Sequence, residues 1–343
     1  MNTSASCLLF VLSMPMVAMA QLTVYSDVAG FDTVSVAGTG GAESKLTFAA
    51  TEFLQSAKYL SVASAVGPNT LTDSSATWSD DEFNGNNGSH YVEIISVNGS
   101  KTGAGVGVTR SITDTEANSK TITLDEALPE GLIAPLEYRI VSHWTLAAIF
   151  GSANMAGLQG GSPLSADHVQ LWNGTGYDSY YYQTSGIGGT GWRKLGDQST
   201  DASNAIIRPE QNVIIKRVGS AGLPIVLSGW VKTGQTSFDI VPGFNFVPNP
   251  YSTAMTLASS GLYKGNAATG IAAGNVTSAD QVMLWNGSSY ETFYYQTLGL
   301  GGTGWRKVGD QSMDASGASI APGSSIILRR KNPDRFTWAI PQH

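Results

Sequence analysis

One long block of sequence occurs twice in this chain of 343 residues, and it constrains the fold more than any other feature. Residues 166–199 and 279–312 are identical at 24 of their 34 positions, at a constant offset of 113. The register extends outward and aligns Ile149-Phe150 with Leu262-Tyr263. A gapless repeat of this length indicates a duplication. Two copies of nearly domain size predict paired domains, because solenoids use short repeats in larger number.

The residues inside each copy predict short strands separated by turns. Val169–Trp172 is rich in β-forming residues, and Asn173-Gly174 follows it. An Asn-Gly pair favours a hairpin, because a type I′ turn needs positive φ at both central residues. We expect Tyr177–Gln183 to be the returning strand, with further strands at Trp192–Leu195 and Asn212–Arg217. The second copy repeats this pattern at the same offset, with its Asn-Gly pair at 286–287.

The residues before the repeat follow the same pattern of short strands. Phe31–Val36, Tyr59–Val66, Tyr91–Val97 and Thr121–Leu124 read as strands with turn residues between them. Charged residues make up only 13% of the chain, against about 25% in an average soluble protein. Regularly spaced short strands of this kind are typical of β-sandwiches and barrels.

We therefore predict an all-β fold in three modules. An acidic N-terminal β module would span residues 21–142, and two duplicated β-sandwich or barrel-like modules would span 143–247 and 248–343. Two short helices are expected, at Thr51–Tyr59 and at Thr145–Phe150, the second closed by Gly151.

Residues 1–20 have the features of a signal peptide. Residues 7–18 form a short apolar run, and Ala18-Met19-Ala20 fits the small-x-small cleavage rule. We expect cleavage near Ala20 and export to the periplasm, the cell surface or the medium. Cys7 is the only cysteine, so the mature chain would hold no disulfide and no thiol nucleophile. No later apolar stretch is long enough to cross a bilayer as a helix, which predicts no membrane-spanning segment.

The net charge of −7 is unevenly distributed. Residues 21–134 carry 14 acidic and 5 basic residues, whereas residues 135–343 carry 12 acidic and 14 basic residues. Neither part has the dense basic face that phosphate binding requires, so nucleic acid is not expected as a partner.

Aromatic side chains are the first candidate binding groups. Tyr and Trp suit stacking on a sugar ring or a protein surface, but they also pack in cores and in cross-strand pairs. If they form a sugar site, at least one of Tyr180, Tyr181 and Tyr182 should be solvent-exposed, and so should its counterpart in the second copy. Partners would then be polysaccharides or other surface proteins. The candidate residues are Trp172, Tyr177, Tyr180, Tyr182, Trp192, Trp285, Tyr290, Tyr295 and Trp305.

Repeated aspartates form the second candidate site. Asp197 and Asp201 recur as Asp310 and Asp314. Such pairs could bind calcium or act as a glycosidase pair, but Asp and Ser also cap turns, which is the interpretation that we favour. A catalytic site would not need two identical copies. We therefore predict no metal site and no cofactor.

Catalytic sequence motifs are absent. The chain has no G-x-S-x-G elbow, no H-E-x-x-H and no Walker loop. None of the four histidines pairs with another at metal-ligand spacing. The sequence thus favours an exported, non-catalytic binding or structural protein, with carbohydrate as the preferred ligand. The alternative is an extracellular hydrolase that acts on polysaccharide.

Several short motifs resemble those of a known family. They are Tyr25–Phe31, Trp78–Phe83, Trp144–Leu146 and the Trp-Arg-Lys-Leu-Gly sequence at 192–196. Together with the signal peptide, they resemble a family of exported bacterial β-rich proteins best represented among verrucomicrobia. That family has no established activity, so the resemblance implies export but assigns no catalytic residue.

Overall fold

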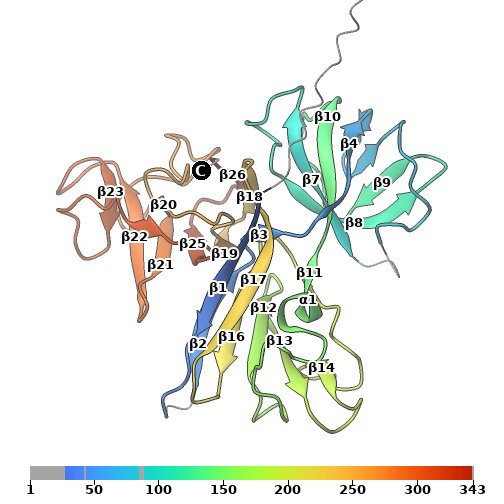
Figure 1. Cartoon of the computed structure of the whole chain (residues 1–343). Helices are drawn as coiled ribbons and strands as arrows, with labels where there is room; N and C mark the ends of the chain where they lie inside the picture. Colours follow the sequence, from blue (N-terminus) through green and yellow to red (C-terminus); the bar gives the residue numbers. More distant parts are fainter. Residues whose placement is uncertain (1–27, 42–43, 85–88, 342–343) are drawn as a thin grey trace, which may run out of the picture.

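The computed structural model describes residues 28–41, 44–84 and 89–341, and the predicted signal peptide lies outside these residues. The described chain consists mainly of antiparallel strands, with α1 (Leu146–Phe150) as its one helix, so the predicted all-β class is confirmed. Three hydrophobic cores form. Figure 1 shows three bodies that meet beside the long ribbon of β1 and β17.

One body, which we call the seven-stranded unit, is a single curved sheet. Its strands, in spatial order, are β4 (Ala57–Ala63), β10 (Leu136–Ser142), β7 (His90–Val97), β8 (Thr109–Glu116), β9 (Thr121–Leu124), β6 (Thr70–Thr72) and β5 (Ala65–Val66). Only Ser64 separates β4 from β5 in the chain, although they lie at opposite ends of this order. The sheet therefore curls back on itself around a core that includes Trp78, Ile94 and Tyr138.

The second body, the first unit, packs a five-stranded sheet against smaller sheets. The five strands, in spatial order, are β14 (Gly191–Lys194), β13 (Tyr177–Gln183), β12 (His168–Trp172), β16 (Asn212–Arg217) and β2 (Lys45–Ala50). The smaller sheets are β1 (Ala29–Val36) with β17 (Leu223–Val231) and β3 (Phe53–Leu54), and β11 (Trp144–Thr145) with β15 (Ile206–Ile207). Val36, Val169 and Leu227 from these layers share one core.

The third body, the second unit, has the same arrangement. Its five-stranded sheet is β23 (Gly304–Lys307), β22 (Tyr290–Gln296), β21 (Gln281–Trp285), β25 (Ser325–Arg330) and β19 (Gly243–Pro248). Its smaller sheets are β18 (Thr236–Ile240) with β26 (Phe336–Ile340), and β20 (Met255–Thr256) with β24 (Ser319–Ile320). Val169 pairs with Tyr180 in the first unit, and Val282 pairs with Phe293 in the second, so the strand register is repeated as well.

The hydrogen-bonded sheets cross both of the predicted module boundaries. β1 and β2 precede the seven-stranded unit in the chain, yet they pair with β17 and β16. β18 and β19 begin before residue 248, yet they pair with β26 and β25. The strands of the seven-stranded unit thus lie in the chain between strands of the first unit. The aligned repeat covers residues 149–217 and 262–330, and the edge strands β1, β2, β18 and β19 lie outside both copies.

The two helix predictions had different outcomes. α1 is confirmed, because the Thr145 hydroxyl accepts a hydrogen bond from the Ala148 backbone N–H, and Gly151 ends the helix at φ 84°. The helix predicted at Thr51–Tyr59 is wrong. Phe53 and Leu54 form β3 and pair with β17 instead, and this long-range pairing with burial of both side chains outweighs local helix propensity.

Candidate functional site

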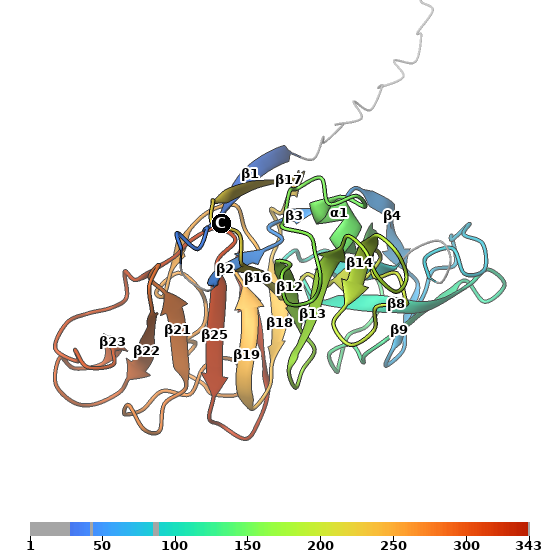
Figure 2. The ribbon, with the colours of Figure 1, turned by 90° about the horizontal axis from the view of Figure 1, so that it is seen from below.

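A cleft of about 650 Å³ lies where all three units meet. The seven-stranded unit contributes side chains from β7, β8 and the turn after β9, the first unit contributes β12, β13 and residues 206–211, and the second unit contributes residues 237–247. Figure 2 shows β18 and β19 beside β12 and β13, with β8 and β9 beyond them. No single module of the sequence could have formed this site.

Ion pairs join the units across the cleft. The Arg110 guanidinium donates to the Asp239 carboxylate at 2.7 Å and connects β8 to β18. Arg208 donates to Asp125 at 2.6 Å and connects the first unit to the seven-stranded unit. These pairs are partly shielded from water, and they hold polar groups at fixed positions around the cleft.

His143 lies at the buried side of the cleft as a neutral imidazole. Burial, assisted by the positive charge of Arg208, lowers the pKa of His143 to about 3. Its Nε2 lies 3.0 Å from the Ser111 hydroxyl, and its ring lies 4.9 Å from that of Tyr91. Nδ1 has no hydrogen-bond partner among the described residues. The pair therefore lacks the carboxylate that orients histidine in a hydrolase triad, and an imidazole with this pKa is a weak base.

Glu210 faces the cleft from the turn between β15 and β16. About 38% of its side-chain surface is accessible, and Glu210 is one of the residues that line the cleft. Enclosure by the protein raises the pKa of Glu210, although Arg208, 3.9 Å away, opposes this rise. A hydrogen-bond donor or a cation on a ligand would stabilise the ionised form of an enclosed carboxyl group of this kind.

The predicted aromatic residues have three different locations. Trp192 and Trp305 are buried in the cores of the two units, and Tyr182 and Tyr295 pack edge-on against them. Tyr180 is half-buried, and it lines the cleft.

The other four predicted aromatic residues lie where the two units pack together. Trp172 and Tyr177 contact Phe246 of the second unit, with ring centroids 5.0 and 5.8 Å away. In the reverse direction, Trp285 and Tyr290 contact Phe48 of the first unit, both at 5.7 Å. Of the nine candidates, only Trp172 and Tyr180 line the cleft.

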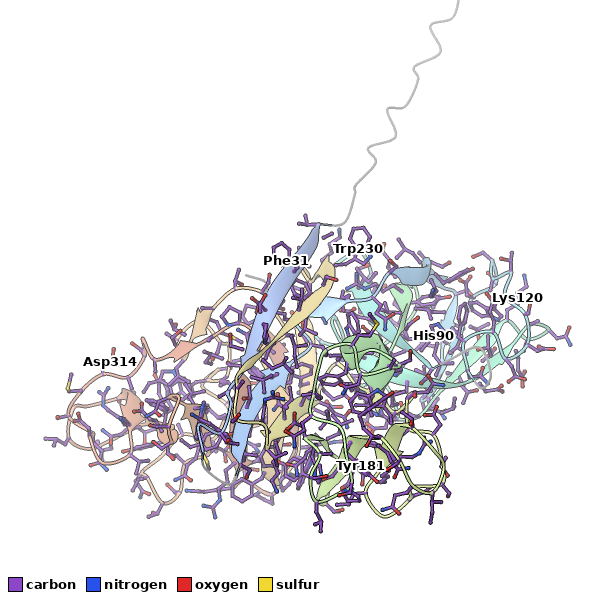
Figure 3. All side chains as sticks on the ribbon, turned by 60° about the horizontal axis from the view of Figure 1, so that its bottom comes forward. Phe31, His90, Lys120, Tyr181, Trp230 and Asp314 are labelled. Carbon is purple, nitrogen blue, oxygen red and sulfur yellow. The ribbon has the colours of Figure 1, made fainter. Side chains whose placement is uncertain are left out.

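The expectation of an exposed tyrosine in each repeat is wrong. Tyr181 and Tyr294 are buried, and their hydroxyls lie within hydrogen-bond distance of Gln183 and Gln296. The neighbouring aromatic residues at 180, 182, 293 and 295 are buried or half-buried. Figure 3 shows Tyr181 within the body of the first unit. Tyr180 and Tyr182 pack against the core of the first unit, whereas Tyr181 lies beside Gln183, which donates to backbone carbonyls of the loop at 187–189. Strand alternation therefore leaves none of the three fully exposed.

The repeated aspartates form turn contacts. Asp197 accepts a hydrogen bond from the Ser199 hydroxyl at 2.8 Å, and Asp310 accepts the equivalent bond from Ser312 at 3.0 Å. Asp201 and Asp314 each accept from the serine two residues later, and each lies 3.4 Å from an arginine. Hydrogen bonds from Ser199 and Thr200 lower the pKa of Asp197. The described residues contain no group of three or more His, Cys, Asp and Glu side chains that could hold a metal. Figure 3 shows Asp314 at the outer end of the second unit, remote from the seven-stranded unit.

Most of the charged residues of the cleft were missed from sequence. Arg110, Asp125, Arg208, Glu210 and Asp239 belong to no motif. One usable indication was available, because the aligned repeats differ here: Arg-Pro-Glu-Gln at 208–211 corresponds to Ala-Pro-Gly-Ser at 321–324. This part of the cleft therefore lies where the two copies differ in sequence, not where they are identical.

No known protein family, curated protein or solved structure matches this chain. In the part of the chain that the structure describes, no helix is both long enough and apolar enough to cross a membrane. The chemistry of the cleft therefore has to be interpreted from its own geometry.

Proposed function

We propose that this protein is exported and is a non-catalytic glycan-binding protein whose ligand occupies the cleft between the three units. The observation that carries the proposal is the composition of the cleft. Trp172, Tyr180 and Phe246 offer aromatic rings, and carboxylates and guanidiniums lie around them. A sugar ring has an apolar CH face, which can stack on an aromatic ring, and hydroxyl groups, which can form hydrogen bonds with carboxylates and guanidiniums. A volume of about 650 Å³ lies within the range of small-ligand sites.

The proposal implies one site per chain. In the second unit, Trp285 and Phe293 stand at the positions of Trp172 and Tyr180, but neither lines this cleft. The seven-stranded unit forms a wall of the cleft that contains Trp172 and Tyr180 of the first unit. The duplication therefore does not imply two binding sites, one in each repeat.

Retention on a panel of polysaccharide gels, followed by calorimetry with the retained oligosaccharide, tests this proposal. Trp172→Ala should weaken binding about 30-fold, since a central aromatic contact contributes about 2 kcal/mol. Trp285→Ala is the matched control, because it removes the same packing against a phenylalanine of the other unit. Equal weakening by both variants would place the site elsewhere, and no retention on any polysaccharide would contradict glycan binding.

One observation favours hydrolysis as a second candidate function. Asp125 and Glu210 both lie beside Arg208, and enclosure raises the pKa of Glu210. Two carboxyl groups close together, one of them with a raised pKa, are the arrangement that glycoside hydrolysis uses. Release of reducing ends from a bound polysaccharide, abolished by Glu210→Gln, would establish this function. Binding without any product would favour the non-catalytic proposal.

A further inference from the structure

The charges that line the cleft are unequal in number. Two guanidiniums line it, against five carboxylates: Asp125, Glu126, Asp178, Glu210 and Asp239. Both guanidiniums are already engaged. Arg110 donates to Asp239 and to the backbone carbonyls of Thr109 and Ala127, and Arg208 donates to Asp125. Asp178 is paired with Lys194 at 2.8 Å. Glu126 and Glu210 are the excess negative charges.

An anionic ligand would enter a cleft in which both guanidiniums already face carboxylates. A uronate or sulfate group at Arg110 or Arg208 would lie beside the carboxylate that this guanidinium already holds. Repulsion from the two excess glutamates adds to the repulsion from this carboxylate. An ammonium group meets the opposite situation, because each free carboxylate oxygen can accept a hydrogen bond from it.

Neither excess charge belongs to the repeated scaffold: Glu126 lies in the seven-stranded unit, and Glu210 lies in the first unit at a position where the two copies differ. Arg208 and Glu210 align with Ala321 and Gly323, whereas the proline between them occurs in both copies. The turn therefore keeps its proline and changes its chemistry where it faces the cleft. Conversely, Asp178, whose charge is already neutralised by Lys194, aligns with Glu291, which is neutralised by Lys307.

We propose, as a refinement that rests on the glycan-binding function above, that the cleft selects a glycan carrying free amino groups, of the glucosamine type, over neutral and anionic glycans. The aromatic rings take the apolar faces of the sugar, and Glu210 and Glu126 take the ammonium groups. Enclosure raises the pKa of Glu210, and a bound ammonium group would oppose that rise.

Calorimetry on the full mature chain tests this selection with three oligosaccharides of equal length: glucosamine, N-acetylglucosamine and galacturonate oligomers. At mildly acidic pH we expect the glucosamine oligomer to bind about tenfold tighter than the acetylated one, as for a hydrogen bond to a charged group. Its advantage should shrink with added salt. The galacturonate oligomer should show no binding.

Glu210→Gln should bring the affinities for the glucosamine and acetylated oligomers to within about threefold of each other, because the glucosamine oligomer loses the charged partner of its ammonium group. Glu126→Gln is a second variant at a more exposed position. Glu291→Gln, in the second unit and outside the cleft, is the matched control and should change nothing. Melting temperatures verify that each variant is folded.

The outcomes separate the two proposals. If the acetylated oligomer binds but the amine gives no advantage, or if Glu210→Gln leaves the preference unchanged, the amine selection is wrong and glycan binding stands. Tighter binding of galacturonate also overturns the selection. If no sugar binds, the proposed function itself fails. Equal competition by oligolysine would overturn the glycan assignment in favour of a basic peptide.

Discussion

The first and second units share one scaffold, and they differ in what lies next to it. Strand order and register are the same, and each unit places a tryptophan and a tyrosine against a phenylalanine of the other. Yet Trp172 lines a cleft, whereas Trp285 does not line it and is 39% exposed. The seven-stranded unit and the turn at 208–211 account for the difference. A repeated β scaffold can therefore keep its packing while one copy acquires a site from its neighbours.

The largest effect is expected at a buried ion pair that is present in both units. Arg217 donates to Asp167, and Arg330 donates to Asp280 at 2.6 Å. Asp167→Ala and Asp280→Ala should each lower the free energy of unfolding by about 3–5 kcal/mol, because each leaves a buried guanidinium without its partner. Urea unfolding measures both. A large loss at one position and a loss below about 1 kcal/mol at the other would break the energetic equivalence of the two units.

A second test uses a feature that only the first unit has. After β17 the chain places Lys232 in a buried ion pair with Glu93 at 2.9 Å, and Glu93 also pairs with Arg139. Although burial opposes it, the two cations lower the pKa of Glu93 from 4.5 to about 2. Since the folded pKa lies below the unfolded one, the stabilisation is present above about pH 4.5 and is lost as pH falls towards 2.

We expect this loss to amount to about 3 kcal/mol, measured as the acid dependence of urea unfolding. Glu93→Gln should remove that part of the dependence and lower stability at neutral pH. Glu291→Gln, at a surface pair with Lys307, is the control and should leave the acid profile unchanged. An unchanged profile in Glu93→Gln would show that the first unit is not held to the seven-stranded unit by this pair.

The smallest effect is expected at the aromatic contacts between the first and second units. Phe48→Ala removes the partner of Trp285 and Tyr290, and Phe246→Ala removes the partner of Trp172 and Tyr177. Both phenylalanines are half-buried, so each loss should be about 2 kcal/mol. Only Phe246→Ala should also weaken glycan binding, because Phe48 does not line the cleft. Weakened binding in Phe48→Ala would contradict a single site.

Local sequence patterns predicted most strands inside the repeat. Tyr177–Gln183 and Asn212–Arg217 were placed with their observed limits, because alternation, β-forming residues and an Asn-Gly turn act within a few residues of the chain. The same reasoning failed at Phe53 and Leu54, whose strand exists only because β17 lies beside them. It also failed for the tyrosines, because strand alternation does not reveal whether the second face of a strand is covered, and here the loop at 187–189 folds back over Gln183 beside Tyr181.

The candidate site, too, could be predicted only in part from the sequence. The sequence by itself determined the all-β class, the hairpins and the aromatic residues available for contact, since these depend on residue type and short-range spacing. Only the tertiary structure decided that β1 and β2 join the first unit, that Arg110 meets Asp239 across 129 residues, and that Arg208 meets Asp125 across 83. Such contacts arise from the packing of complete units around separate cores, and no local pattern encodes where three packed bodies leave a cleft.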